Sequence, residues 1–279
     1  MKVGCPAALG MTLVLAFAAP ASSAYFDHSP YDGILRHYVD EDGTVDYDGI
    51  RLNSLTALES YFETLANADL AGWPRPEQTA FWINAYNARV LYRVAQKPRL
   101  KKMSQAWGLL ELPSKVAGRM ISPVDIKHLL RKSGDPRILF ALSDGTLGGP
   151  KLCNAAYTAD TLDMMLEKEA STFVNSQNVQ EIRGHLQLSN VFKWYEKDFQ
   201  KTGGVPAFIT SRLNPDQRSD GERIKMLLAT AYRKCVFVYN WTFNDRKNKA
   251  MSPQSQMLTP GEVPPDAFSM SNPDLSKDR

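Results

Sequence analysis

The sequence has 279 residues, of which 43% are hydrophobic and 23% are charged, and its formal net charge at pH 7 is +3. These proportions are typical of a globular protein. The charge is too small to indicate a nucleic-acid partner, which would need a broad basic surface with base-stacking aromatics. The short basic run at 97–102 is typical of a solvated face.

The first 24 residues have the pattern of a secretory signal peptide. Lys2 precedes an uncharged, mostly apolar run from Ala7 to Ala19, and small residues lead to a cleavage site after Ala24. The run is shorter than the roughly 20 apolar residues that span a bilayer, and no other stretch resembles a transmembrane helix. We therefore expect an exported protein, periplasmic or secreted, with no membrane span once the signal is removed.

The pattern of apolar residues predicts several helices in the first half of the mature chain. The strongest is expected at 77–96, where apolar residues cover most of the circumference, so this helix should be buried centrally. Ser122 and Pro123 begin another helix, since serine can cap a helix and proline suits its first position; this helix ends before Gly134. Two shorter helices are expected nearer the N-terminus, at 31–38 and 52–66.

In the second half, a short buried strand is expected at 137–142, ahead of a glycine-rich loop. A helix, a hairpin turning at Gly184, a second helix and a last strand follow, at 158–175, 179–188, 223–233 and 235–240. Beyond Asn244 the composition turns to Pro, Ser, Asp and Lys, which predicts a disordered tail over 245–279. We expect an α+β fold: a single domain over 25–244 with a small, mostly antiparallel sheet and flanking helices.

Two cysteines, Cys153 and Cys235, follow the signal peptide. In an oxidising compartment such a pair can form a disulfide, and buried free thiols are the alternative, because sequence alone does not give the distance between them. The four histidines are far apart and there is no Cys-x-x-Cys pair. We therefore expect neither a metal site nor a cofactor.

Five segments form a pattern that spans nearly the whole mature chain. They are Phe81–Ala88 (FWINAYNA), Ile121–His128 (ISPVDIKH), Asp135–Leu142 (DPRILFAL), Phe192–Phe199 (FKWYEKDF) and Tyr239–Asn244 (YNWTFN). In this order they resemble the bacterial and plant family filed as domain of unknown function 547. The resemblance implies a papain- or transglutaminase-like protein, in which a histidine and a helix N-terminus would activate a cysteine thiolate.

The chain departs from the family pattern at most of its chemical positions. The family has a glutamate-histidine pair, a histidine in the strand, and two loop cysteines, the second followed by proline. The corresponding residues here are Lys127 and His128, Leu139, Asp144, and Gly149 with Pro150. Leucine cannot act as a base and glycine cannot attack. The comparison therefore predicts a catalytically degenerate member that keeps a cleft for a peptide, a cell-envelope fragment or a protein.

An active enzyme is the alternative. A hydrolase or amidase could use a relocated nucleophile, Cys153 or Ser143, with His128 as base and Asp144 as its partner. A scaffolding protein without a ligand is a third interpretation.

Other candidate residues would bind a ligand without reacting with it. Asn84 and Asn87 share one side of the central helix and either latch neighbouring loops or line the cleft with His128. Backbone N–H groups at Gly148 and Gly149 could hold an anion.

Overall fold

Helix α4, Arg75–Ala95, lies at the centre of the helical part of the protein in a computed structural model that describes residues 26–106, 108–214, 216 and 218–249. Most of its residues from Ala80 onward are buried, as its apolar circumference predicts. The helices expected at 31–38 and 52–66 are confirmed as α1 (Ser29–Tyr38) and α3 (Leu55–Asn67). The expected signal peptide and residues 250–279 of the expected tail lie outside the described residues.

Helix α6, Pro123–Arg131, begins as the sequence predicts. The hydroxyl of Ser122 accepts a hydrogen bond from the backbone N–H of Asp125, and the Asp125 carboxylate accepts one from the N–H of Ser122. This capping box satisfies two N–H groups that the first turn would otherwise leave unpaired. Further helices are α2 (Tyr47–Asn53), α5 (Gly108–Glu111), α8 (Leu162–Val174), α9 (Asn190–Trp194), α10 (Gly204–Arg212) and α11 (Gly221–Ala231).

The prediction of a strand at 137–142 is wrong, because this segment forms the short helix α7, Ile138–Ala141. The Asp135 carboxylate accepts a hydrogen bond from the N–H of Arg137, and the N–H groups of Ile138 and Leu139 then bond to carbonyls three residues earlier. A short, continuously apolar run fits a buried helix as well as a buried strand, so periodicity could not separate the two.

Two small sheets complete the α+β fold. Strands β1 (Ser114–Val116) and β2 (Arg119–Ile121) form an antiparallel hairpin that the sequence did not reveal. The predicted hairpin at 179–188 is confirmed as β3 (Val179–Ile182) and β4 (His185–Ser189). Its two turn residues, Arg183 and Gly184, both have positive φ, which matches the twist of a two-residue hairpin. Strand β5 (Val236–Val238) adds to β4 in parallel.

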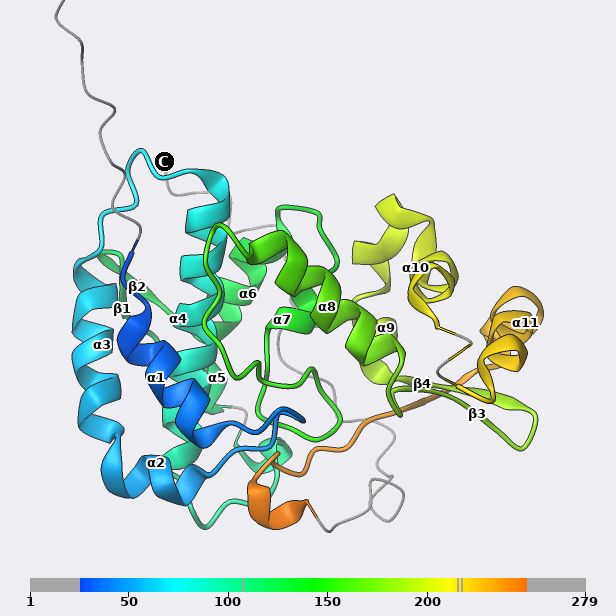
Figure 1. The fold of residues 1–279 in the computed structure, drawn as a ribbon, viewed down its shortest axis with the longest axis horizontal. Coiled ribbons are helices and arrows are strands. Elements are labelled where there is room, and N and C mark those ends of the chain that lie inside the picture. Colours follow the sequence, from blue (N-terminus) through cyan, green and yellow to red (C-terminus); the bar gives the residue numbers. More distant parts are fainter. Residues whose placement is uncertain (1–25, 107, 215, 217, 250–279) are drawn as a thin grey trace, which may run out of the picture.

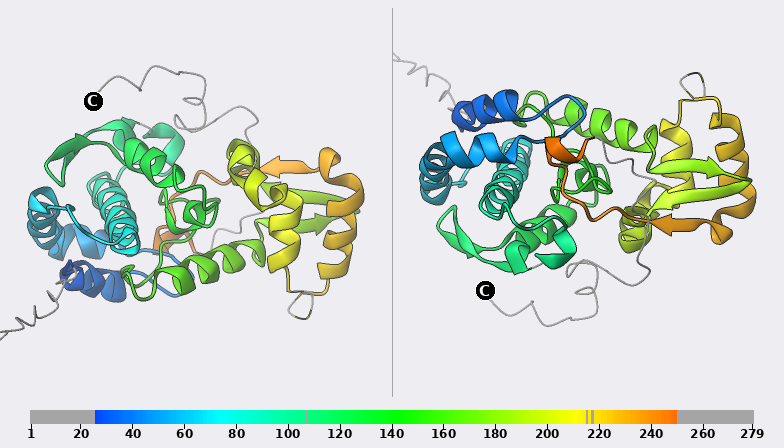
Figure 2. Two further views of the ribbon diagram at one scale, coloured as in Figure 1. Left: turned by 90° about the horizontal axis from the view of Figure 1, so that it is seen from above. Right: turned by 90° about the horizontal axis from the view of Figure 1, so that it is seen from below.

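The elements are arranged in series along the long axis of the molecule. Figures 1 and 2 show α1–α4 at one end and β3–β5 with α10 and α11 at the other, with α7 and α8 between them. A cluster of phenylalanine rings joins these parts: Phe140, Phe173, Phe192, Phe199 and Phe208. Within the part of the chain that the structure describes, no helix has the length and apolar character needed to cross a bilayer.

The segment after β5, residues 239–249, returns across the helical body and pairs with three loops. Its backbone bonds to Met103, Leu147 and Val45 in turn. The first five residues of the expected tail are among the described residues, and they include a 3₁₀ turn at Arg246–Asn248. Ion pairs hold this turn and the residue after it to the loop after α1 and to the first turn of α2; they are Arg246–Asp40, Arg246–Asp46, Lys247–Asp48 and Lys249–Asp42.

Candidate functional site

The loop after α7, residues 142–151, contains three of the positions singled out by the family resemblance, Asp144, Gly149 and Pro150, and Asn87 fixes its start. The Asn87 carbonyl accepts a hydrogen bond from the N–H of Ser143 at 3.0 Å, and its amide donates to the carbonyl of Ala141 at 2.9 Å. Ser143 is 2% exposed, and its hydroxyl accepts a bond from Gly145 in the same loop. The hydroxyl is therefore part of the loop's own structure.

Asn84, one turn earlier on α4, makes a matching pair of hydrogen bonds to the backbone of Tyr157. Its amide donates to the carbonyl of Tyr157 at 2.8 Å, and its carbonyl accepts from the N–H of Tyr157 at 3.0 Å. Each asparagine thus provides both a donor and an acceptor to buried backbone that has left regular secondary structure. With these hydrogen bonds Asn84 and Asn87 hold neighbouring loops to α4, which is the first of the two roles considered for them above.

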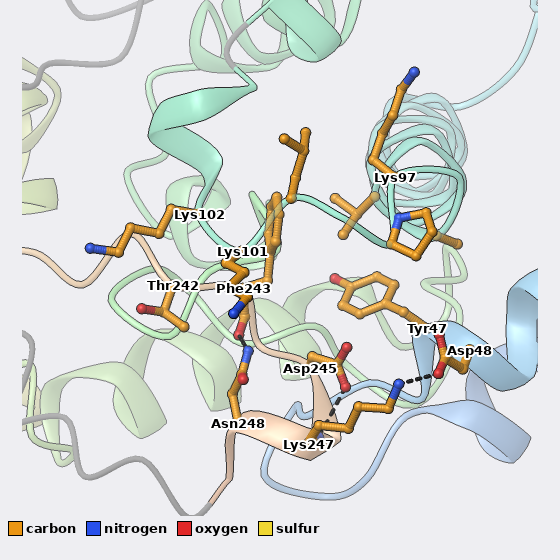
Figure 3. Close-up of a pocket in the computed structure, with 14 residues that line it drawn as sticks. Tyr47, Asp48, Lys97, Lys101, Lys102, Thr242, Phe243, Asp245, Lys247 and Asn248 are labelled. Atoms are coloured by element: carbon orange, nitrogen blue, oxygen red, sulfur yellow. Dashed lines mark hydrogen bonds and ion pairs between the residues drawn. The ribbon is translucent and has the colours of Figure 1, made fainter.

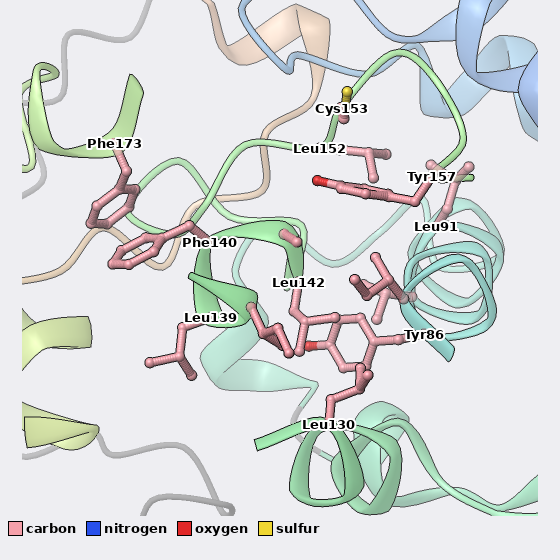
Figure 4. Packing of buried hydrophobic residues seen from close by; sticks show 14 of the residues in the cluster. Tyr86, Leu91, Leu130, Leu139, Phe140, Leu142, Leu152, Cys153, Tyr157 and Phe173 are labelled. Carbon is pink, nitrogen blue, oxygen red and sulfur yellow. The ribbon is translucent and has the colours of Figure 1, made fainter. Parts of the chain in front are cut away.

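Four family positions meet around one very small cavity. Lys127, Leu139, Asp144 and Pro150 line it, and its volume of about 20 Å³ is close to the minimum for a single water molecule. The other lining residues are Leu110, Leu142, Val191, Trp194, Tyr195 and Tyr239. Figure 4 shows Leu142 beside the ring of Tyr86 in this region, with Leu139 extending to the other side. The space where the family chemistry would take place is therefore filled by side chains.

His128 does not line this cavity. It follows Lys127 on α6, and consecutive residues of a helix point about 100° apart. Lys127, which is 9% exposed, lies with its Nζ 5.5 Å from the Tyr86 ring centroid and 5.7 Å from that of Tyr195. The lysine that replaces the family glutamate is thus held by two aromatic faces, which attract a cation.

Asp144, at the first loop-cysteine position, belongs to a closed hydrogen-bond network. Its Oδ1 accepts from the hydroxyl of Thr146 at 2.7 Å, and its Oδ2 accepts from the hydroxyl of Tyr239. The Thr146 and Tyr239 hydroxyl oxygens are 3.0 Å apart, and the N–H of Gly149 donates to Thr146 Oγ1 at 3.1 Å. Burial and the neighbouring Asp144 raise the pKa of Tyr239 well above its ordinary value, so its proton stays in place.

Gly149, at the second loop-cysteine position, leaves no room for a side chain. A Cβ built there would lie 2.6 Å from Asp144 Oδ1 and 2.6 Å from the Tyr239 hydroxyl oxygen. The same test at Gly148 brings the Cβ against the backbone of Asn240, to which the Gly148 N–H donates at 2.9 Å. The glycines are therefore required by close packing, and both of their N–H groups bond within the protein.

The structure does not join Cys153 to Cys235, and both are free thiols. Cys153 is 9% exposed, and burial together with the nearby Glu169 raises its pKa. Burial also raises the pKa of Cys235, to about 11. A thiol with a raised pKa holds little thiolate at neutral pH, which is the opposite of what a nucleophile requires.

A larger cavity of about 370 Å³ lies on the other side of Gly149 and Pro150, and we call it the α8 cavity. Its floor is apolar, and Glu169 on α8 contributes a carboxylate that is only 3% exposed. The complete lining is Glu41, Asp42, Phe140, Leu147, Gly149, Pro150, Lys151, Glu169, Thr172, Phe173, Ser176, Gln177 and Asn178.

The Glu169 carboxylate is only partly satisfied. Its Oε2 lies 3.8 Å from Lys151 Nζ, whereas its Oε1 is buried without a hydrogen-bond partner among the described residues. Burial raises the pKa of Glu169, although Lys151, Lys168 and the Cys153 thiol act in the opposite direction. The sequence does hold a signal for this residue, because Glu169 interrupts the apolar stripe of Leu166, Ala170 and Phe173 on its helix.

The described residues contain no group of three or more His, Cys, Asp or Glu side chains placed to hold a metal ion. In comparison with known protein families, residues 70–174 match the family described as "Protein of unknown function, DUF547". This confirms the resemblance, and the matched residues contain α4, α6, α7, the loop at 142–151 and α8. No curated protein and no solved structure matches the chain.

Proposed function

We propose that this chain, a member of the DUF547 family through residues 70–174, is an exported binding protein without the chemistry that the family positions imply. Its ligand would occupy the α8 cavity. The observation that carries the proposal is a cavity of about 370 Å³ whose lining combines apolar side chains with Glu169, a carboxylate that is only 3% exposed. Small-molecule sites usually combine a mostly apolar wall with a few fixed polar groups, within a volume of 300–1,000 Å³.

The family positions support a loss of catalysis. Gly149 and Leu139 carry no reactive group, and the space around Asp144 holds about one water molecule. The relocated-nucleophile alternative gains no support, since Cys153 has a raised pKa and the Ser143 hydroxyl bonds within its own loop. His128 lines neither this space nor the α8 cavity.

The lining of the α8 cavity indicates the chemistry of the ligand. Phe140 and Phe173 offer an aromatic floor, and Glu169 adds a carboxylate to the lining, which favours a protonated amine or an amide N–H in the ligand. Glu41 adds a further negative charge to the lining, whereas the charge of Asp42 is paired with Lys249. A peptide or peptide-bearing envelope fragment with a free amine and an apolar side chain fits these features. Pairing a buried carboxylate with such a donor removes the cost of leaving it unsatisfied.

The test is calorimetric titration of the mature protein with a tripeptide that has a central phenylalanine, with its amino terminus either free or acetylated. We expect saturable binding of the free form, and at least about tenfold weaker binding of the acetylated form. Glu169→Gln should weaken the free form by a similar factor, because a charge-assisted hydrogen bond contributes about 1.5–3 kcal/mol.

Glu222→Gln on exposed α11 is the matched control and should bind normally. Thermal melting separates binding from folding, since Glu169→Gln removes a poorly satisfied buried carboxylate and should melt no lower than the unaltered protein. The proposal would be overturned if neither peptide binds. It would also be overturned if the parent protein binds both peptides equally well and the Glu169→Gln variant binds them as tightly as the parent does. Mass spectrometry should recover the peptide intact, and cleavage would restore the enzyme alternative.

A further inference from the structure

A second cavity, of about 250 Å³, lies where the loop after α4 meets the C-terminal segment, and we call it the lysine-rimmed cavity (Figure 3). Three separate parts of the chain build it: α2, the end of α4 with the loop at 97–102, and residues 242–248. Its lining residues are Tyr47, Asp48, Val94, Ala95, Lys97, Pro98, Leu100, Lys101, Lys102, Thr242, Phe243, Asp245, Lys247 and Asn248.

The interior of this cavity is apolar. Val94 and Ala95 come from the last turn of α4, and Phe243 faces them from the C-terminal segment. Tyr47 presents its ring, since its hydroxyl donates to Asn244 Oδ1 at 2.7 Å. Burial raises the pKa of this hydroxyl, so it brings no charge to the cavity.

Unpaired positive charge gathers at the rim. Lys97, Lys101 and Lys102 are exposed, and none has a carboxylate partner among the described residues. Figure 3 shows Lys97 and Lys102 extending outward from the cavity, while Lys101 lies beside Phe243. The fourth lysine of the lining, Lys247, differs from these three because it forms an ion pair with Asp48.

The second carboxylate of the lining, Asp245, offsets only part of the charge of the rim lysines. Asp245 Oδ1 accepts the backbone N–H of Lys247 at 2.9 Å and so caps the 3₁₀ turn. The basic side chains of that turn and its next residue pair with acidic residues of the loop after α1 and of α2. The lining holds four lysines and two aspartates, which leaves an excess of two positive charges at the rim.

We propose that the lysine-rimmed cavity binds a small amphiphilic anion, with its apolar group inside and its carboxylate or phosphate at the rim lysines. About 250 Å³ corresponds to roughly eight groups the size of a water molecule, each taking about 30 Å³ of liquid. An acid with a chain of about that length fits. This site is independent of the α8 cavity and of the function proposed for it.

The probes are butanoate, hexanoate, octanoate, octyl phosphate, 1-octanol and inorganic phosphate, each titrated calorimetrically into the mature protein at two salt concentrations. We expect affinity to rise about fourfold per added methylene up to octanoate. Octanoate and octyl phosphate should bind more tightly than octanol or inorganic phosphate, and added salt should weaken their binding.

Two variants locate the site. The double substitution Lys101→Gln and Lys102→Gln should weaken octanoate roughly three- to tenfold, as expected for exposed charge pairs. The matched control is Lys132→Gln with Lys234→Gln, two exposed lysines outside the cavity, and it should bind octanoate normally. Ala95→Phe, which fills the cavity from α4, should abolish octanoate binding.

Other outcomes would overturn the proposal. Inorganic phosphate binding as tightly as octanoate would reduce the site to a charged surface, and octanol binding equally would leave the lysines without a role. Equal loss in the Lys132/Lys234 control would remove the assignment to this cavity. Co-sedimentation with phosphatidylglycerol vesicles that octanoate does not reduce would assign the lysines to a membrane surface instead.

Discussion

Replacing Gly149 by alanine tests whether the former cysteine position is sealed by the Asp144–Tyr239 network. The new Cβ would lie 2.6 Å from both Asp144 Oδ1 and the Tyr239 hydroxyl oxygen and 3.0 Å from Thr146 Oγ1. Overpacking of this kind costs about 1–3 kcal/mol, and weakening a hydrogen bond to a buried carboxylate adds about 1.5–3 kcal/mol. We expect the free energy of unfolding to fall by about 4 kcal/mol. For a domain of this size Tm should fall by roughly 8–16 °C.

Urea unfolding followed by circular dichroism measures this change, and two comparisons give it meaning. Gly33 lies on the exposed face of α1, and a Cβ there meets nothing within 4 Å, so Gly33→Ala should be neutral or stabilise by up to about 1 kcal/mol. Tyr239→Phe removes one clashing oxygen, so the Gly149→Ala/Tyr239→Phe double variant should lose less than the sum of the single losses. The reasoning is refuted if Gly149→Ala stays within about 0.5 kcal/mol of the parent, or if the two losses simply add.

Three further outcomes follow from other buried groups. Asn84→Ala leaves the N–H and carbonyl of Tyr157 unpaired and should cost about 2–4 kcal/mol in urea unfolding; a smaller loss than at an exposed asparagine would contradict the latch role. Burial lowers the pKa of His28 to about 4, so the unfolded chain alone takes up a proton below about pH 6.5. Stability should therefore drop by about 2 kcal/mol between pH 7 and pH 5, and His28→Asn should flatten this dependence. Iodoacetamide should modify half-buried Cys235 before Cys153 in the folded protein, and only slowly below pH 9; rapid labelling of Cys153 at neutral pH would contradict its raised pKa.

The sequence was most informative where a pattern extends over many residues. The buried circumference of α4 and the Ser122 cap of α6 could both be predicted, because local periodicity and capping chemistry decide them. Elements that depend on contacts distant in sequence could not. Strands β1 and β2 have three residues each, and β5 joins β4 across some fifty residues. The run at 137–142 was predicted as a strand because its composition fits either element. Hydrogen bonds from its first residues to the preceding turn make it helical.

The candidate site was only partly accessible from the sequence. Comparison with the family pattern identified Lys127, Leu139 and Asp144, and the structure brings these three together. Their partner Tyr239 lies 95 residues beyond Asp144, so nothing local connects the two. Glu169 was missed because a charged residue within an apolar stripe is more often a solvated edge than a buried carboxylate.

The C-terminal segment described above also determines when the protein can finish folding. Residues 240–246 supply backbone or side-chain bonds to Gly43, Lys101 and Gly145, so these loops stay unlatched until the ribosome has made nearly all of the described chain. Contacts between partners some 200 residues apart form late, because their loop-closure entropy must first be offset. Shortening the chain to residue 239 should therefore trap the helical body as an open, aggregation-prone intermediate.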